Sequence, residues 1–367
     1  MPLPAVSPTS DIPATSTTST TIPTPATVAT EPSTSAPAAH LPAPFFRHLP
    51  VSAFAMVMGL SGLTLVWAKV AQLGWLEAFA AQAAFGLGLF SGLVFLVLLV
   101  FYLRKCLRQP GLVKQEWSHP VGSAFFAAIP VSFALLATVA LGVFGPIALP
   151  LWVIGAVLQA LVFLLILNTW VRRETLKPAD INPVWFIPAV ANVLIPLAGV
   201  RLGLIEVSWW FFGVGMLFWG ILLTLVLARL ILVQSFLPDR LVPALCIFLA
   251  PPAVGFLSWV LLTGQYPDGP GLDPVGHLLF GISLFFALFL VTQVPRFARL
   301  PFFISWWAFS FPVAAFTSAC LVYQSFVPLW PLQLLAAGMV GIASLLISWL
   351  FLRTLWAIWR REPQFVA

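Results

Sequence analysis

Apolar residues run in long blocks along this chain, and short polar segments separate the blocks. Each block is about as long as a helix needs to cross a hydrocarbon core of ~30 Å. Ten such blocks can be delimited, at residues 50–68, 80–103, 120–144, 147–170, 183–200, 207–232, 241–263, 274–293, 301–322 and 331–357. The pattern therefore predicts an all-α polytopic membrane protein with ten transmembrane helices.

The odd-numbered blocks share a start signal, because each begins with a proline at or near its first turn. Proline at the first helical position loses no hydrogen bond. These prolines recur roughly 60 to 70 residues apart, one helical hairpin per interval, and are Pro50, Pro120, Pro183, Pro243 and Pro301. The recurrence predicts five helical hairpins in a quasi-fivefold arrangement around a central pore. The alternative is chance, since the chain has 33 prolines.

Most odd-numbered blocks also carry a helix-breaking residue near their middle. The residues chosen as kinks are Gly59, Pro130, Pro188, Pro251 and Pro312. Proline inside a helix frees backbone groups, which in lipid must be buried in protein or face water. We therefore predict five kinked helices along a central path and five straighter helices around them. The alternative is that the kinks serve only helix packing.

Aromatic and small polar side chains lie close to the predicted kinks. A phenylalanine ring at a kink could plug a narrow path, and the candidates are Phe54, Phe126, Phe186, Phe248 and Phe311. Hydroxyl and amide groups can bind a passing anion weakly, and the candidates are Ser61, Ser132, Asn192, Ser310 and Thr317. For any single phenylalanine, packing against lipid or a neighbouring helix is the stronger alternative.

Charge supports this topology. Charged residues make up 8 % of the chain and apolar residues 61 %, which excludes an ordinary soluble domain. All of the 17 lysines and arginines except Lys69 and Arg201 fall on one side of the predicted membrane. Cationic loops resist translocation, so this side is predicted to be cytoplasmic, with both termini on it. The net charge of +6 reflects this bias and does not indicate nucleic-acid binding.

Ionisable side chains are nearly absent from the blocks themselves. Charged groups inside spans usually mark coupling sites in pumps and symporters, and acidic rings mark cation pathways. Their scarcity favours passive conduction of anions. The three cysteines and four histidines show no metal-ligand or haem spacing, so no cofactor and no metal is expected.

The first 44 residues differ from the rest, because they are rich in Pro, Ala, Ser and Thr and contain no Lys or Arg. They cannot bury enough apolar surface to fold, so residues 1–44 are predicted to be a disordered cytoplasmic tail. Residues 45–360 form the predicted transmembrane channel domain, and 361–367 a short cytoplasmic C-terminus.

Two stretches carry a family resemblance. PVSAFAMVMGLSGLTLVW, from Pro50 to Trp67, and WWAFSFPVAAFTSA, from Trp306 to Ala319, resemble the first and ninth spans of the slow anion channel and tellurite-resistance/dicarboxylate transporter (TehA-like) family. The resemblance covers roughly residues 45–360. It implies a homotrimer whose subunits each have their own pore, and a pore-blocking phenylalanine in a Phe-Pro setting, which maps to Phe311 beside Pro312.

The sequence and the resemblance together predict a passive, phenylalanine-gated channel for small monovalent anions such as chloride or nitrate. Its expected partners are these inorganic anions and the lipid bilayer of a cell (inner) membrane. One alternative is a carrier for malate, another C4-dicarboxylate or tellurite, with or without proton coupling. A membrane enzyme is the third, and it is disfavoured because no cluster of His, Asp, Glu or Cys is visible near one interface.

Overall fold

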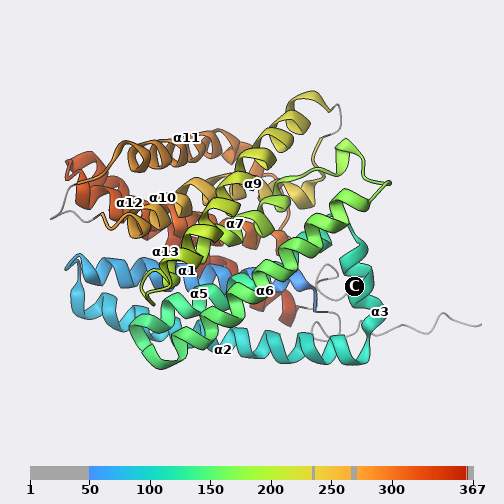
Figure 1. The fold of residues 1–367 in the computed structure, drawn as a ribbon, viewed down its shortest axis with the longest axis horizontal. Coiled ribbons are helices and arrows are strands. Elements are labelled where there is room, and N and C mark those ends of the chain that lie inside the picture. Colours follow the sequence, from blue (N-terminus) through green and yellow to red (C-terminus); the bar gives the residue numbers. More distant parts are fainter. Residues whose placement is uncertain (1–48, 234–235, 266–270, 361, 363–367) are drawn as a thin grey trace, which may run out of the picture. The chain divides into compact units, whose positions relative to one another are not determined.

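The computed structural model describes residues 49–233, 236–265, 271–360 and 362. Within them every regular element is an α-helix or a 3-10 helix, as predicted for an all-α protein (Figure 1). The predicted tail, 1–44, lies outside the described residues, and so does the predicted C-terminus, 361–367, apart from Glu362.

Nine helical segments in the described part of the chain are long and apolar enough to cross a membrane. The remaining predicted span, Pro183–Gly199, is apolar but shorter and interrupted. Five elements form a central ring: α1 (Ala55–Gln72), α5 (Ala128–Val143), α7 (Phe186–Leu194) continued by α8 (Pro196–Gly199), α10 (Ala250–Leu262) and α12 (Ser310–Phe326). Five others form a peripheral ring: α2 (Glu77–Arg108), α6 (Gly145–Arg172), α9 (Ile205–Leu232), α11 (Pro274–Phe297) and α13 (Trp330–Trp359).

Contacts between consecutive central helices close the ring. α1 contacts α5, α5 contacts α7, α7 contacts α10, α10 contacts α12, and α12 returns to α1. Each peripheral helix packs on its hairpin partner and on the next central helix, as α2 does on α1 and α5 (Figure 1). This arrangement confirms the predicted five hairpins.

Burial separates the two rings. In the central spans that are long enough to cross a membrane, 72–83 % of the apolar segment of each span is buried inside the protein. In the peripheral helices only 22–33 % of the corresponding segment is buried. The exposed side chains of the peripheral helices are large and apolar, as in Leu93, Leu164 and Leu345. Such a surface is stable when lipid chains cover it, so the hydropathy of the peripheral helices reflects a lipid-facing surface rather than a protein core.

The prolines that were predicted to kink the central helices lie instead where these helices begin. Each central α-helix follows a short 3-10 or single-turn segment: η2 (Val51–Phe54), α4 (Gly122–Phe125), η4 (Pro183–Trp185), η5 (Asp239–Leu249) and η6 (Ile304–Phe309). Pro130, Pro188, Pro251 and Pro312 lie in the first turn of the α-helix that comes next. A proline there costs no i to i−4 hydrogen bond. The prolines therefore mark helix starts inside the spans, and do not kink a continuous helix.

The predicted helix break at Gly59 is also wrong, because α1 runs unbroken through this residue. A methyl group added at Gly59 would clash with the Ser310 Oγ, and one added at Gly62 would lie 2.8 Å from the Ala314 Cβ. The two glycines thus allow α1 and α12 to approach closely, which is a packing role.

Polar side chains from neighbouring helices and from the span itself donate hydrogen bonds to backbone carbonyls of the interrupted span. Pro188 O accepts hydrogen bonds from Gln159 Nε2 (2.8 Å) and Asn192 Nδ2 (3.0 Å). Ile195 O accepts one from Trp152 Nε1 (2.9 Å), and Val193 O accepts one from Ser258 Oγ (2.6 Å). A break in a membrane helix is stable only when its freed carbonyls find such partners.

Candidate functional site

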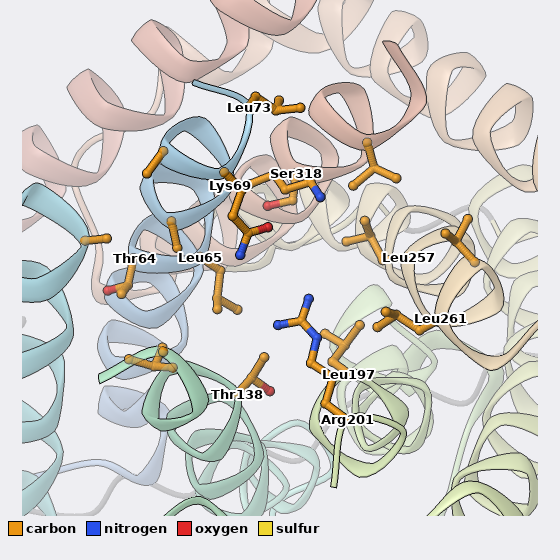
Figure 2. Close-up of a pocket in the computed structure, with 18 of the residues that line it drawn as sticks. Thr64, Leu65, Lys69, Leu73, Thr138, Leu197, Arg201, Leu257, Leu261 and Ser318 are labelled. Atoms are coloured by element: carbon orange, nitrogen blue, oxygen red, sulfur yellow. The ribbon is translucent and has the colours of Figure 1, made fainter. Parts of the chain in front are cut away.

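A large cavity opens at the C-terminal end of the central ring. Its volume is about 630 Å³, within the range of small-molecule sites. Residues from all five central spans line it, together with residues from α2. We call this cavity the vestibule (Figure 2).

The vestibule holds both cations that depart from the charge bias of the chain. Lys69, near the end of α1, and Arg201, just after α8, line it. Figure 2 shows them on opposite walls, with the Arg201 guanidinium directed into the cavity. None of the described residues that line the vestibule is acidic. In the sequence these two residues are exceptions to the charge bias, but their separation of more than a hundred positions hides that they share a cavity. Their shared position at the C-terminal ends of central spans is the signal that could have revealed it.

A second, small cavity lies in the N-terminal half of the same ring. Its volume is about 40 Å³, which leaves room for only a few water molecules. Every central span contributes to its wall, as with Met58, Val131, Val190, Ile247 and Phe311. None of the described residues that line the small cavity carries a charge. An ion at this level would therefore face an apolar, nearly dry wall.

Phe311 stands between the two cavities. It lines the small cavity together with Pro312, and its side chain is 6 % exposed. Its Cδ2 atom would lie 3.4 Å from a methyl group added at Gly62. On α1, Gly62 lies between Met58 of the small cavity and Thr64 of the vestibule. The ring therefore meets α1 at the level that separates the two spaces.

The other predicted phenylalanines line neither cavity. Phe54 makes edge contacts with Phe95 and Tyr102 of α2, and Phe126 with Tyr102 and Trp117. Phe186 contacts Phe248, which contacts Phe286 of α11. These four rings pack between helices, the alternative given for them from the sequence. Gly59, Pro130, Pro188 and Pro251 also stay outside both linings.

The predicted anion-binding hydroxyls and amide are used for packing. Ser61 Oγ bonds to Ser91 Oγ of α2 at 2.7 Å. The others donate to backbone carbonyls in or just before their own helix, namely Ser132, Asn192, Ser310 and Thr317. All five are buried, and none lines either cavity. The polar groups in the vestibule are different residues, among them Gln72, Thr138 and Ser318.

An ion pair that the sequence did not predict fixes the start of the first span. Lys105 Nζ lies 2.8 Å from Glu116 Oε1 and also donates to Leu49 O at 2.9 Å. Tyr102 OH donates to Glu116 Oε2 at 3.1 Å. Glu116 belongs to the short helix α3 (Pro110–Ser118). This cluster joins α2 and α3 to the N-terminal, narrow end of the central ring. From the sequence, Lys105 is predicted only to be one of the basic residues of a cytoplasmic loop.

Metal-binding geometry is not found in the part of the chain that the structure describes. No group of three or more His, Cys, Asp or Glu side chains is placed to hold an ion there. Cys106, Cys246 and Cys320 are all free thiols.

Comparison with known proteins agrees with this architecture. A family model described as voltage-dependent anion channel matches residues 48–355. The chain is 27 % identical to the S-type anion channel SLAH2 of Arabidopsis thaliana over 83 % of its own length, and 26 % identical to the guard cell S-type anion channel SLAC1 over 85 %. These alignments span only 58 % and 56 % of the two plant proteins.

A bacterial relative is covered more fully. The chain is 26 % identical to the tellurite resistance protein TehA homolog of Haemophilus influenzae, across 75 % of this chain and 81 % of that protein. The family model spans most of the ten-span region, including the Phe311–Pro312 segment. The chain therefore belongs to the voltage-dependent anion channel family, which confirms the resemblance seen in its first and ninth spans.

Proposed function

We propose that this protein is a passive channel for small monovalent anions such as chloride and nitrate, and that Phe311 is its gate. The observation that carries the proposal is the position of the Phe311 ring, in contact range of α1 at Gly62, between a wide vestibule and a small apolar cavity. Ions that follow the axis of the central ring must pass this level. A narrow apolar constriction of this kind gates a channel by excluding water.

The charge of the lining supports an anion as the permeating species. Lys69 and Arg201 line the vestibule, and cationic side chains at an entrance favour anions over cations. The small cavity offers no fixed charge that would hold an anion tightly. Weak binding inside the path favours rapid exit, which conduction requires.

The lack of ionisable groups in the wall of the small cavity supports passive transport. A proton-coupled carrier needs a group that gains and loses a proton during its cycle. No such group lines the small cavity among the described residues.

The second candidate is a carrier for a C4-dicarboxylate or tellurite. Two observations support it: the two cations of the vestibule suit a dianion, and the bacterial relative is named as a tellurite resistance protein.

The same proposal extends to orientation and assembly. Because basic loops resist translocation, we infer that the N-terminal ends of the central helices face the cytoplasm and that the vestibule faces the outside of a cell inner membrane. The family resemblance adds a homotrimer, with one path in each subunit. Cross-linking of the purified protein in nanodiscs would test the trimer, and a ladder that stops at the dimer would contradict it.

Voltage-clamp recording of wild type and Phe311→Ala in chloride, nitrate and malate tests the gate. Removing the ring should raise the chloride and nitrate currents about tenfold or more, because each tenfold step needs only ~1.4 kcal/mol of barrier. The matched control is Phe309→Ala. Phe309 stacks on Trp306 and contacts Phe297 of α11, and it lines neither cavity.

Three results would decide between the candidates. Large anion currents in Phe311→Ala and small ones in Phe309→Ala support the channel and its gate. Equal currents in wild type and a folded, membrane-inserted Phe311→Ala protein refute the gate. Malate uptake that follows an imposed pH gradient at constant voltage, without current in either protein, supports the carrier instead.

A further inference from the structure

The lipid-facing side of α2 ends in two arginines. Leu103 and Leu107, in the last two turns, are 52 % and 84 % exposed and continue the apolar outer surface of this helix. Arg104 and Arg108 follow them directly in the chain, are also exposed, and therefore lie beside the same face. Neither arginine forms an ion pair with any residue that the structure describes. The edge of the lipid-facing surface thus carries two positive charges without a carboxylate from the described chain.

The spacing of these two charges makes them unfavourable without a counter-ion. Arg104 and Arg108 are four residues apart and so are neighbours on the helix surface, where like charges destabilise a helix. The C-terminus of α2 carries a partial charge of about −0.5, which offsets only part of their repulsion. An anion between the two guanidinium groups would remove the rest.

The position of the pair along α2 indicates which anion is at hand. α2 has 32 residues, whereas a helix needs about 20 to cross the hydrocarbon core. Charged side chains avoid the hydrocarbon, so the end of α2 that carries Arg104 and Arg108 lies at the level of the lipid headgroups. Phosphate groups are the anions of that layer, and a guanidinium can bind a phosphate with two parallel hydrogen bonds.

Arginines at the same end of α13 have partners within the protein. Arg353 pairs with Glu362 at 2.9 Å, and its guanidinium lies 4.5 Å from the centre of the Trp356 ring. The guanidinium of Arg360 lies 4.7 Å from the centre of the same ring. In the described part of the chain, neither a carboxylate nor an aromatic ring serves Arg104 or Arg108 in this way. The pair on α2 is therefore the one left for a ligand from outside the protein.

The following helix, α3, adds a third cation. α3 lies across the end of α2 (Figure 1). Its partly buried residues are Leu112, Val113, Glu116 and Trp117, whereas Lys114 lies on its exposed side. A helix with one apolar side at the edge of a membrane lies in the interface, where each lysine or arginine strengthens the attraction for anionic lipid. Lys114 thus increases the positive potential beside the two arginines.

α3 also connects this corner to the narrow end of the central ring. Glu116 Oε1 accepts a hydrogen bond from Val51 N at 3.4 Å, at the first residue of η2. The Trp117 ring makes an edge contact with Phe126 just before α5, with 4.9 Å between the ring centroids. A methyl group added at Gly122 of α4 would lie 2.5 Å from Glu116 O. A ligand that holds α3 in place would therefore also hold the starts of the first two central spans.

We propose that Arg104 and Arg108, assisted by Lys114, bind the phosphate of an anionic phospholipid, and that the bound lipid stabilises the contact of α3 with the narrow end. The guanidinium groups bind the phosphate, while Leu103 and Leu107 contact the acyl chains. The exposed leucines favour a lipid over a free phosphate ion, because only the lipid covers them. This site does not depend on the proposed channel function.

Lipid binding tests the site directly. Phosphatidylglycerol is titrated onto the purified protein in detergent, and bound lipid is measured by native mass spectrometry, with phosphatidylcholine as the reference lipid. We expect Arg104→Gln and Arg108→Gln each to weaken phosphatidylglycerol binding about fivefold, and the double variant about 25-fold. The matched control is Arg296→Gln, which removes one exposed charge from the last turn of α11 and should change binding less than about twofold.

Two results of this titration would overturn the proposal. One is equal phosphatidylglycerol binding by wild type and the Arg104→Gln, Arg108→Gln double variant. The other is displacement of the bound lipid by inorganic phosphate at the same concentration, which would show that the site recognises the phosphate ion alone. Binding of phosphatidylglycerol that needs both arginines and resists inorganic phosphate supports the lipid site.

Hydrogen–deuterium exchange tests the connection to the central ring. Phosphatidylglycerol should slow amide exchange in residues 51–54 about twofold or more in wild type, and leave it unchanged in the double variant. Residues 205–210, at the opposite end of α9, serve as the internal reference and should not respond. If lipid binds but exchange in residues 51–54 stays the same, the stabilisation of the narrow end is refuted and the lipid site itself stands.

Discussion

The two halves of the central ring are built from the same five spans but differ in almost every physical property. The half with the small cavity begins with 3-10 or single-turn segments, is closely packed and apolar, and is anchored by the buried Lys105. The half with the vestibule is regular α-helix and wide, and its lining combines apolar residues with polar and cationic groups. The comparison indicates that close helix contact produces the barrier, whereas separation of the same helices produces the entrance.

A consequence is that the narrow half should tolerate substitution poorly and the wide half well. Four substitutions test this difference, in decreasing order of expected effect. For each, stability is read as the thermal midpoint of the purified protein in detergent.

The largest effect is expected for Glu116→Gln at the narrow end. The change removes the charge that compensates Lys105, whose side chain is 5 % exposed. Leaving a buried charge without its partner costs about 3 kcal/mol, so the midpoint should fall strongly. Glu362→Gln is the control, because its partner Arg353 is 24 % exposed and such pairs contribute less than about 1 kcal/mol. Equal losses in the two variants would show that the Lys105 cluster does not anchor this end.

A pair of glycines tests packing directly. Gly62→Ala should destabilise by about 1–3 kcal/mol, because its new methyl group would lie 2.8 Å from the Ala314 Cβ. Gly142→Ala, in α5 at the vestibule, meets nothing within 4 Å and should be neutral or stabilise by up to about 1 kcal/mol. If both variants changed stability alike, the narrow half would not be the more tightly packed one.

A hydrogen bond behind the small cavity should have an intermediate effect. Trp307 lines this cavity, and its Nε1 donates to Thr354 Oγ1 of α13 at 2.9 Å. Trp307→Phe should cost about 1 kcal/mol for the lost bond, besides some packing. A double-mutant cycle with Thr354→Val isolates the bond, and a coupling energy near zero would refute its role in holding the wall.

The smallest effect is expected in the vestibule wall. Thr138→Val keeps the shape of the side chain and removes a hydroxyl that donates only to Ala134 O of its own helix. Since this bond lies within one helix, we expect a change of less than about 0.5 kcal/mol in stability and less than about twofold in anion current. A large loss of current would mean that vestibule hydroxyls take part in binding anions.

The candidate site was only partly predictable. The predicted gate, Phe311, lies between the cavities, although its role as a gate stays a prediction until currents are measured. Phe54, Phe126, Phe186 and Phe248 carry the same sequence signal, a ring near a helix break, but pack against neighbouring helices. Which way a ring points depends on the rotation of its helix about its axis, which local sequence does not specify.

The polar residues show the same limit. A hydroxyl near a helix break can bind an anion, which makes Ser132 and Thr317 candidates from the sequence, yet each donates to a carbonyl of its own helix. In an apolar environment an unbonded donor costs more than it does in water, so the nearest carbonyl takes it. Their use in packing follows from the structure around them and not from their position in the chain.

By itself, the sequence determined the all-α class, the spans and their order, the family, and the repeated proline start of each hairpin. These follow from local rules: bilayer thickness sets span length, charge sets topology, and proline sets where a helix begins. Only the tertiary structure decided how α1 and α12 meet at Gly59 and Gly62, and that Lys69 and Arg201 share one cavity. Those features depend on contacts between residues more than a hundred positions apart, because packing and electrostatics act through space.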